Sequence, residues 1–379
     1  MPIPYGRHTV DADDIEAVTA VLRGDWLTQG PEVTHFEEAF AGACGAPFAV
    51  AFSSGTAALH ACAFAAGIGP GDDLLTSALT FSASANCGAY LGATPRFADI
   101  DPDTWNVSAA TVEAALTPAT KMVVPVHFAG LPAPIEDIRA AVGDQVVVVE
   151  DAAHALGART PEGTVGSCKN SDMAVFSTHP VKAIATGEGG VVTTRSEELR
   201  DRLMRFRNHG FVRPELHRRT GQGGWYREQH DLGFNYRLSD LHSALGRSQL
   251  TKLDRFIEQR NAVATRYREW LADIPGLLLP PAAAAGCVHA YHLFVIQCED
   301  PDRRGALYDG LRGEDIFTQV HYLPVYLHPY YMDTFGYGPG LCPEAEAYYA
   351  RCLSIPCFPA LSRADQQHVV EAIRDLMAA

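Results

Sequence analysis

The sharpest chemical signal in the sequence is a lysine that stands between an apolar run and a cluster of glycines. The segment STHPVKAIATGEGG covers residues 177–190, and its Lys182 is the only lysine between Lys169 and Lys252. An amine held in apolar surroundings loses its proton more readily and becomes nucleophilic, as Schiff-base chemistry with an aldehyde requires. A solvated lysine on a flexible loop is the alternative interpretation, because most lysines lie at the surface.

A second polar group, Ser53-Ser54-Gly55-Thr56, follows an apolar run and opens a helical pattern. The unpaired N–H groups at the start of a helix, together with its positive dipole end, form a site for an anion. Gly55 lets the backbone approach a ligand closely, and Ser54 and Thr56 add hydroxyl donors. The alternative interpretation is an ordinary helix N-cap by Ser or Thr.

A third polar group, EDAAH at residues 150–154, comes directly after the apolar residues 146–149. In parallel sheets, ligands bind beyond the carboxyl ends of the strands. A carboxylate in that place, such as Asp151, could accept a hydrogen bond from a protonated ring nitrogen and hold its proton there. The alternative is a helix N-cap by Asp151 beside a structural histidine, His154.

Taken together, the three groups match the needs of pyridoxal 5′-phosphate (PLP). This cofactor requires an amine for its aldehyde, a carboxylate for its pyridine nitrogen and donors for its phosphate. Ser177, near Lys182, is placed to be one of those donors. The sequence contains no HExxH, no GxGxxG after its first predicted strand and no GxxxxGK[ST]. Its histidines and cysteines show no metal-ligand spacing, so we expect no metal site.

Alternating apolar runs and helical patterns indicate the elements that position these residues. Short apolar runs predict strands over residues 47–52, 73–77, 121–126, 145–149, 173–176, 190–194 and 289–297. Helical patterns predict helices over residues 56–66, 82–91, 135–141, 197–206, 239–249, 253–271 and 360–377. Strands of this kind, separated by helices, indicate an α/β fold with a mainly parallel sheet that is covered on both faces. We expect a large domain over residues 1–249 and a smaller C-terminal α/β domain over residues 250–379.

A segment rich in Arg, Gly and His, over residues 205–230, interrupts this pattern and predicts a long loop. Guanidinium groups suit phosphate oxygens, so its arginines could bind a nucleotide diphosphate. A solvated loop is the alternative interpretation. The arginines concerned are Arg213, Arg218, Arg219 and Arg227.

Composition argues against several other classes of protein. The chain has 379 residues and a formal charge of −15, which disfavours nucleic-acid binding. Its nine cysteines contain no CxxC pair and are expected to be free thiols in a reducing cytosol. The sequence shows no apolar signal core and no apolar run of the ~18 residues that span a bilayer. We therefore expect a cytoplasmic protein that does not bind membranes.

The motifs GDWLTQGP, SSGTAALH, EDAAHALGA, FSTHPVKAIATGEGG and GFNYRLSD resemble those of the DegT/DnrJ/EryC1/StrS family. The resemblance extends from Tyr5 to about residue 359 and implies a PLP-dependent sugar aminotransferase of fold type I, the fold of aspartate aminotransferase. The phrases WLTQGP, VPVHFAG, HYLPVYLHPYY and LCPEAEAYY resemble the branch that acts in pseudaminic acid biosynthesis. That branch aminates C4 of UDP-2-acetamido-2,6-dideoxy-β-L-arabino-hex-4-ulose.

The resemblance also implies a role for each matching residue. Lys182 becomes the Schiff-base lysine, and Asp151 becomes the partner of the pyridine nitrogen. The other implied cofactor-binding residues are Gly55, Thr56 and Ser177 at the phosphate, Phe81 on the ring, His154 near the ring hydroxyl and Asn235 from a neighbouring subunit. The residues expected to bind the substrates are Tyr5, Trp26, Thr28, Arg237, His321 and Tyr322.

Some of these assignments have structural alternatives. Trp26 and Thr28 could serve packing alone, and His321 and Tyr322 could be core or turn residues. Two positions, Thr178 and Ala185, depart from the family pattern, where many relatives have Phe and Thr. Both departures leave the lysine, the serine and the glycines intact, so they bear on the substrate more than on the chemistry.

The implied partners are L-glutamate as amino donor and a nucleotide sugar as acceptor. If Asn235 acts in the neighbouring subunit, the active sites are shared and the protein is a homodimer. Three alternatives stay open: amination at C3, a dTDP-linked sugar, and a regulator that binds PLP and a sugar nucleotide without turnover.

Overall fold

A seven-stranded sheet lies at the centre of the computed structural model, which describes residues 2–212 and 225–378. The strand order is β1-β9-β8-β5-β4-β2-β3, and all neighbours are parallel except that β9 is antiparallel to both β1 and β8. The predicted α/β fold with a mainly parallel sheet is therefore confirmed. The strands are β1 (Phe48–Phe52), β2 (Asp73–Ser77), β3 (Thr94–Ala98), β4 (Thr120–Val124), β5 (Val147–Asp151), β8 (Met173–Ser177) and β9 (Gly190–Thr194).

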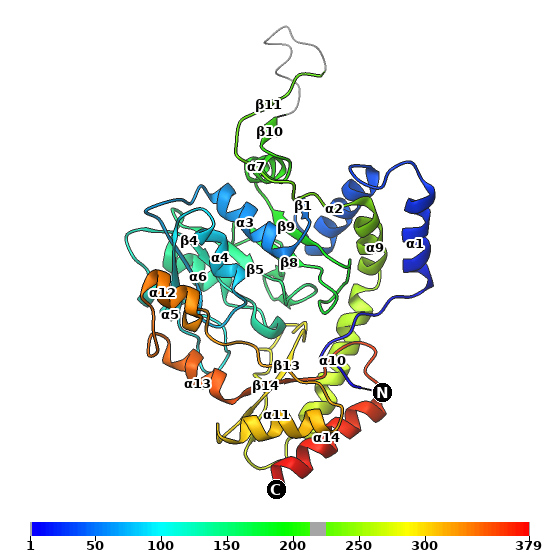
Figure 1. The fold of residues 1–379 in the computed structure, drawn as a ribbon, viewed down its shortest axis with the longest axis vertical. Helices are drawn as coiled ribbons and strands as arrows, with labels where there is room; N and C mark the ends of the chain where they lie inside the picture. Colours follow the sequence, from blue (N-terminus) through cyan, green and yellow to red (C-terminus); the bar gives the residue numbers. More distant parts are fainter. Residues whose placement is uncertain (1, 213–224, 379) are drawn as a thin grey trace.

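The side chains of this sheet alternate between two hydrophobic cores, as the two-residue period of a strand requires. In β8, Val175 packs into one core, whereas Ala174 and Phe176 pack into the other. The helix α3 (Gly55–Ala66) belongs to the first core and α2 (Pro31–Cys44) to the second (Figure 1). Because both faces are covered, the inner strands read as nearly continuous apolar runs.

A smaller antiparallel sheet forms a separate core in the C-terminal region. Its strands, in pairing order, are β12 (Leu277–Leu278), β13 (Phe294–Cys298) and β14 (Cys352–Ile355). They pack with the helices α10 (Leu253–Trp270), α11 (Arg303–Gly313) and α14 (Arg363–Ala378), below the large sheet in Figure 1. The division of the chain into domains at residue 250 stays a prediction.

The other elements surround these two sheets. The helices are α1 (Ala12–Arg23), α4 (Ala83–Ala89), α5 (Ala109–Ala115), α6 (Ile135–Val142), α7 (Glu197–Arg207), α9 (Asp240–Leu250), α12 (Pro329–Phe335) and α13 (Pro343–Arg351), with 3-10 turns at η1 (Phe128–Gly130) and η3 (Val325–Leu327). Two hairpins are formed by β6 (Arg159–Thr160) with β7 (Gly163–Thr164) and by β10 (Phe211–Val212) with β11 (Glu228–Gln229). No helix of the described residues has the length and apolar character needed to cross a membrane.

Several elements of the structure were not predicted from the sequence, among them the helices α1, α2, α5, α11, α12 and α13 and the strands β12 and β14. The strand β3 was not predicted; its Pro95 is tolerated because β3 is an edge strand, where a missing N–H donor costs little. The segment 205–230 is not a simple loop, because α7 extends into it and β10 and β11 form a short hairpin that projects from the molecule (Figure 1). Arg213, Arg218 and Arg219 lie outside the described residues, and Arg227 is exposed.

Candidate active site

The start of α3 forms one end of the candidate site. Ser54 is the N-cap, and its hydroxyl accepts a hydrogen bond from the N–H of Ala57 at 3.1 Å. The earlier N–H groups, on Gly55 and Thr56, have no partner inside the helix and can face an anion. A Cβ on Gly55 would lie 3.1 Å from the Cβ of Ser177, so the glycine allows the helix to approach the end of β8 closely. The start of α3 with Gly55 and Thr56 therefore lies beside Ser177, and the binding of phosphate by these three residues stays a prediction.

The carboxylate of Asp151 lies at the carboxyl end of β5 and is only 5% exposed. Its Oδ2 accepts a hydrogen bond from the hydroxyl of Ser84 at 2.6 Å, and its Oδ1 accepts one from the N–H of Ala153 at 3.1 Å. Within the described residues, no Lys, Arg or His forms an ion pair with it. A buried carboxylate without a cation is costly, so this group fits a protonated ring nitrogen as its missing partner.

Lys182 lies in the turn after β8 and is half-buried. Burial lowers the pKa of its amine to about 8, while the charge of Asp151 raises it and that of Arg260 lowers it. An amine with a pKa near 8 is roughly 10% unprotonated at pH 7, about 300 times more than an ordinary lysine. Lys182 is thus a nucleophilic amine that shares the site with the Asp151 carboxylate.

Three buried histidines surround this amine. The rings of His154 and His292 lie 4.3 Å apart between centroids, and His154 Nε2 lies 3.3 Å from the hydroxyl of Tyr322. The Nδ1 atom of His154 is buried and has no hydrogen-bond partner among residues 2–212 and 225–378. Burial, with a smaller contribution from the charge of Lys182, holds the pKa of His154 and His292 well below the ordinary value, and it lowers that of His321 to about 3. All three are neutral near pH 7, which leaves a ring nitrogen of His154 free for a hydroxyl group of a ligand.

Aromatic residues from three segments form the rim of the site. Phe81, which follows β2, is 58% exposed and lies 6.2 Å from the ring of Tyr322. Tyr5 lies 5.4 Å from the ring of His321 and packs beside it. An exposed Phe81 beside Asp151 and its Ser84 donor can cover the face of a planar ring.

Four of the predicted site residues make no observed contact with Lys182 or Asp151 in the described part of the chain. Trp26 and Thr28 are exposed, and Thr28 pairs with Ser239. Asn235 is exposed and pairs with Asn208, whose side chain also accepts a hydrogen bond from Arg237 at 2.6 Å. Among the contacts of the described residues, none joins these four side chains to Lys182 or Asp151.

Sequence reasoning missed two residues of the site, Ser84 and His292. Ser84 donates to Asp151 across 67 residues of chain, and only its place at the start of a helix that follows a predicted strand could have suggested a role. His292 stands in a segment that the sequence marks as strand, and a buried polar residue there gives no local signal of its partner.

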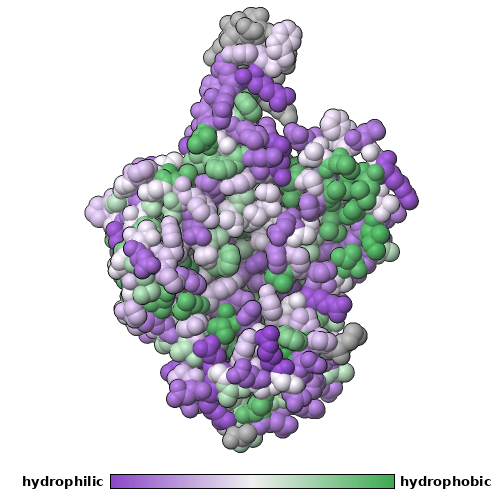
Figure 2. Space-filling view, in the orientation of Figure 1, coloured by the Kyte–Doolittle hydropathy of each residue, from purple (hydrophilic) through white to green (hydrophobic). Residues whose placement is uncertain are grey.

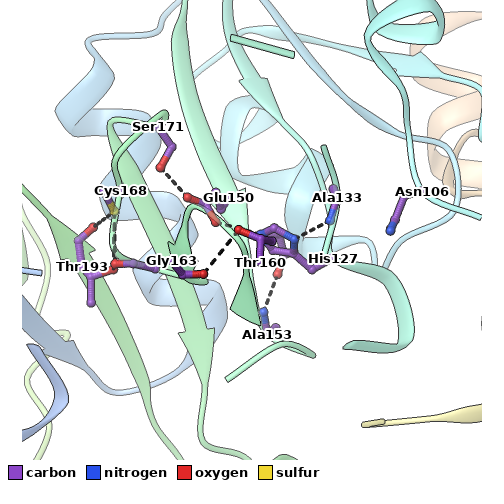
Figure 3. A network of polar contacts seen from close by, with 12 residues as sticks. Asn106, His127, Ala133, Glu150, Ala153, Thr160, Gly163, Cys168, Ser171 and Thr193 are labelled. Atoms are coloured by element: carbon purple, nitrogen blue, oxygen red, sulfur yellow. Dashed lines mark hydrogen bonds and ion pairs between the residues drawn. The ribbon is translucent and has the colours of Figure 1, made fainter. Parts of the chain in front are cut away.

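Behind Asp151, a buried network of polar contacts holds the carboxyl end of β5 (Figure 3). His127 Nδ1 accepts the N–H of Ala133 at 2.8 Å, so its Nε2 donates to Glu150 at 2.8 Å. Glu150 also accepts a hydrogen bond from Ser171 at 2.5 Å. Since the N–H of His127 donates to the carbonyl of Asp151 at 3.1 Å, the network fixes the main chain that carries Asp151.

The described residues contain no group of three or more His, Cys, Asp or Glu side chains arranged to hold a metal ion. They do fit PLP on three independent observations. The start of α3 offers free N–H groups beside Ser177, Asp151 is a buried carboxylate without a cation, and His154 Nδ1 is a buried ring atom without a protein partner. Each corresponds to one polar group of the cofactor.

Comparison with known proteins identifies the class of this protein. Residues 8–374 match the DegT/DnrJ/EryC1/StrS aminotransferase family. The spore coat polysaccharide biosynthesis protein SpsC of Bacillus subtilis is 41% identical over 380 residues, which cover 99% of this chain and 97% of that protein.

Solved structures agree with this match over the full length. Helicobacter pylori PseC, described as an aminotransferase of pseudaminic acid biosynthesis, has a TM-score of 0.92 at 28% identity, with 100% of both chains covered. The Streptococcus pneumoniae protein Spr1654, described as a sugar aminotransferase, has a TM-score of 0.93 in its PMP form at 25% identity, with 99% of both chains covered.

The fold and the comparisons together define a PLP-dependent transferase of fold type I. The chain belongs to the DegT/DnrJ/EryC1/StrS aminotransferase family and is a sugar aminotransferase whose cofactor is PLP.

The hydroxyl of Ser84 is expected to contribute to the affinity for PLP. Ser84→Ala removes a donor from a buried carboxylate, so we expect the affinity for PLP to fall roughly tenfold. Titration of the cofactor-free protein with PLP, followed by fluorescence, measures this change. Ser84→Thr keeps the hydroxyl and is the matched control; equal PLP affinity of all three proteins would contradict the role of Ser84.

The lowered pKa of Lys182 should be visible in the pH dependence of its chemical modification. In the cofactor-free protein, the rate at which an amine-directed reagent modifies Lys182 should rise with pH through a midpoint near 8. Lys252 is the internal control, because hydrogen bonds to Asp11 and Asp14 raise its pKa despite burial. Peptide mapping by mass spectrometry resolves the two sites. A midpoint for Lys182 above pH 10 would show that burial does not activate this amine.

Proposed function

We propose that this aminotransferase moves the amino group of L-glutamate to C4 of a nucleotide-linked 4-keto-6-deoxy sugar. The proposed acceptor is UDP-2-acetamido-2,6-dideoxy-β-L-arabino-hex-4-ulose, an intermediate of pseudaminic acid biosynthesis. The observation that carries the proposal is an amine on Lys182 whose pKa burial lowers to about 8 and whose charge interacts with that of the buried carboxylate of Asp151. The likeness to PseC over the whole chain supports the choice of sugar.

The residues that would hold PLP follow from the contacts of the site. Gly55, Thr56 and Ser177 would bind the phosphate, and the carboxylate of Asp151 would bind the ring nitrogen. His154 Nδ1 would face the ring hydroxyl, and Phe81 would cover the ring. When bound in this way, the cofactor would supply an electron sink for the electron pair that remains on carbon after a C–H proton is removed.

Lys182 is the group that moves protons in the proposed reaction. In the first half, its Nζ takes the proton from the α-carbon of glutamate; in the second, it gives a proton to C4 of the sugar. A pKa near 8 suits both directions, because the same atom must accept and donate close to neutral pH. Asp151 accepts hydrogen bonds from the hydroxyl of Ser84 and the N–H of Ala153, which hold its carboxylate group in place.

The substrate residues divide into two sets. Tyr5, His321 and Tyr322 lie together near Lys182 and would contact the sugar from the same chain. In the part of the chain that the structure describes, no contact joins that set to the other four residues, so we assign these to the site of a second copy in a homodimer: Trp26, Thr28, Asn235 and Arg237. Figure 2 shows apolar side chains gathered on the side of the molecule that carries α1, where Ile15 and Leu22 are 62% and 60% exposed. An apolar face of this kind is suited to a subunit contact.

Mass spectrometry of the products tests the choice of acceptor. The enzyme is offered 15N-labelled glutamate with a panel of UDP- and dTDP-linked 4-keto and 3-keto sugars. We expect the label in the UDP-linked 4-keto sugar, with 2-oxoglutarate released in equal amount. Lys182→Ala is the control that should give no labelled sugar. Label only in a 3-keto or dTDP-linked sugar would overturn the acceptor, and no label in any of them would overturn the proposed transfer from glutamate to a sugar of this panel.

Mixed dimers test the shared site. Lys182→Ala and Asn235→Ala are each expected to lose most activity, but subunits of the two variants, mixed and allowed to exchange, should regain up to about a quarter of it. The recovery follows because one site of the mixed dimer then contains both native residues. Activity that stays at the level of the separate variants, although native mass spectrometry shows exchange, would place Asn235 in its own subunit's site or outside both.

A further inference from the structure

A buried arginine joins the Lys182 turn to the C-terminal region. Arg260 lies on α10 and is 1% exposed. Its Nη1 donates to the carbonyls of Tyr291, at 3.1 Å, and Cys357, at 2.8 Å, and its Nη2 donates to the carbonyl of Lys182 at 3.4 Å. One guanidinium therefore holds three segments that lie far apart in the sequence.

The charge of Arg260 has no acidic counterpart nearby. Within the described residues, no Asp or Glu forms an ion pair with it, and its hydrogen bonds all go to main-chain carbonyls. Burial lowers the pKa of Arg260, but from an ordinary value of 12.5 the group still carries its proton near pH 7. An uncompensated buried cation is unfavourable for stability, which suggests that its charge serves another purpose.

That charge acts on the site. It lowers the pKa of Lys182 and also that of His292, whose carbonyl accepts a weaker hydrogen bond from Arg260 at 3.4 Å. Asp151 also faces Lys182 and acts in the opposite direction, whereas the buried neutral histidines His154 and His321 face it and add little charge. Two further titratable groups, Arg7 and His8, line a cavity together with Lys182 and Arg260. Among these groups Arg260 is the buried arginine, whereas Arg7 and His8 are exposed to solvent.

We propose that Arg260 is a positioning residue of the aminotransferase reaction. It fixes the main chain of Lys182 against the C-terminal region and keeps a permanent positive charge beside the Lys182 amine. This charge opposes protonation of the amine and offsets part of the attraction of Asp151. The inference rests on the proposed role of Lys182 as the cofactor lysine.

Two substitutions separate the charge of Arg260 from its hydrogen bonds. Arg260→Met removes both, whereas Arg260→Lys keeps the charge and loses the planar set of donors. Arg255→Met is the matched control, because Arg255 lies on the same helix with its side chain 56% exposed. The readout is the pH at which the visible absorption band of the PLP-loaded enzyme changes.

The sign of the effect follows from electrostatics. Loss of a neighbouring positive charge favours the protonated nitrogen, so Arg260→Met should move the midpoint upward by roughly one pH unit. Arg260→Lys should move it by less than half as much, and Arg255→Met should not move it. In steady-state kinetics, Arg260→Met should lower kcat at pH 7 at least tenfold and leave KM for the sugar within about twofold.

Failure of this inference is distinguishable from failure of the proposed function. Borohydride reduction of the PLP-loaded wild-type enzyme, followed by peptide mapping, shows which lysine carries the cofactor. Label on another lysine overturns the role of Lys182 and, with it, that of Arg260. Label on Lys182 with an unshifted midpoint in Arg260→Met overturns the role of Arg260 alone. If Arg260→Met does not fold, Arg260→Lys still decides: a shift as large as one pH unit despite the retained charge would contradict the proposal.

Discussion

A buried carboxylate that forms no ion pair with any described residue is the constraint on which the rest of this site depends. Removal of an ionised carboxyl group from water costs several kcal/mol even after relaxation. In the described part of the chain, Asp151 accepts hydrogen bonds from the hydroxyl of Ser84 and the N–H of Ala153 and forms no ion pair, although its charge interacts with that of Lys182. Such a group is retained where a ligand completes it, and the pyridine nitrogen of PLP, once protonated, supplies both a donor and a positive charge. The stability of the protein should therefore depend on its cofactor, since a ligand that binds only the native state stabilises it.

The sheet explains how distant parts of the sequence meet around this carboxylate. β5 and β8 are parallel neighbours, so Asp151 and Ser177, at their last residues, emerge at the same edge. β9 runs in the opposite direction between β8 and β1, and there Gly190 pairs with both Ser177 and Phe52. A Cβ on Gly190 would lie 2.4 Å from the carbonyl oxygen of Ser54, so only glycine allows the start of α3 to approach this edge. The phosphate end and the ring end of the site are thus set by backbone geometry.

Features set by local sequence patterns could be predicted from the sequence, whereas features set by contacts between distant residues could not. β4, β5 and β8 were predictable because buried parallel strands are apolar over their whole length, and Asp151 and Lys182 stood out because they follow such strands. β3 was missed because its Pro95 and Arg96 hide the pattern of an edge strand. Ser84 and Arg260 were missed for another reason: their partners lie 67 and 78 residues away, and neither residue type predicts such a contact from its neighbours. Local sequence patterns indicate secondary structure and the ends of strands, whereas contacts between residues far apart in the sequence are seen only in the three-dimensional structure.

The reactivity of Lys182 is best understood as a balance of opposing effects. Burial and Arg260 favour the free amine, whereas Asp151 favours the protonated one, and the three nearby histidines add little charge because burial keeps them neutral. If burial acted without Asp151, the amine would be a poor proton donor in the second half of the reaction; if Asp151 acted alone, it would be a poor base in the first. A transaminase lysine must accept and donate a proton within one cycle. Because Arg260 lowers the pKa of Lys182 and Asp151 raises it, one nitrogen can serve both halves of the reaction.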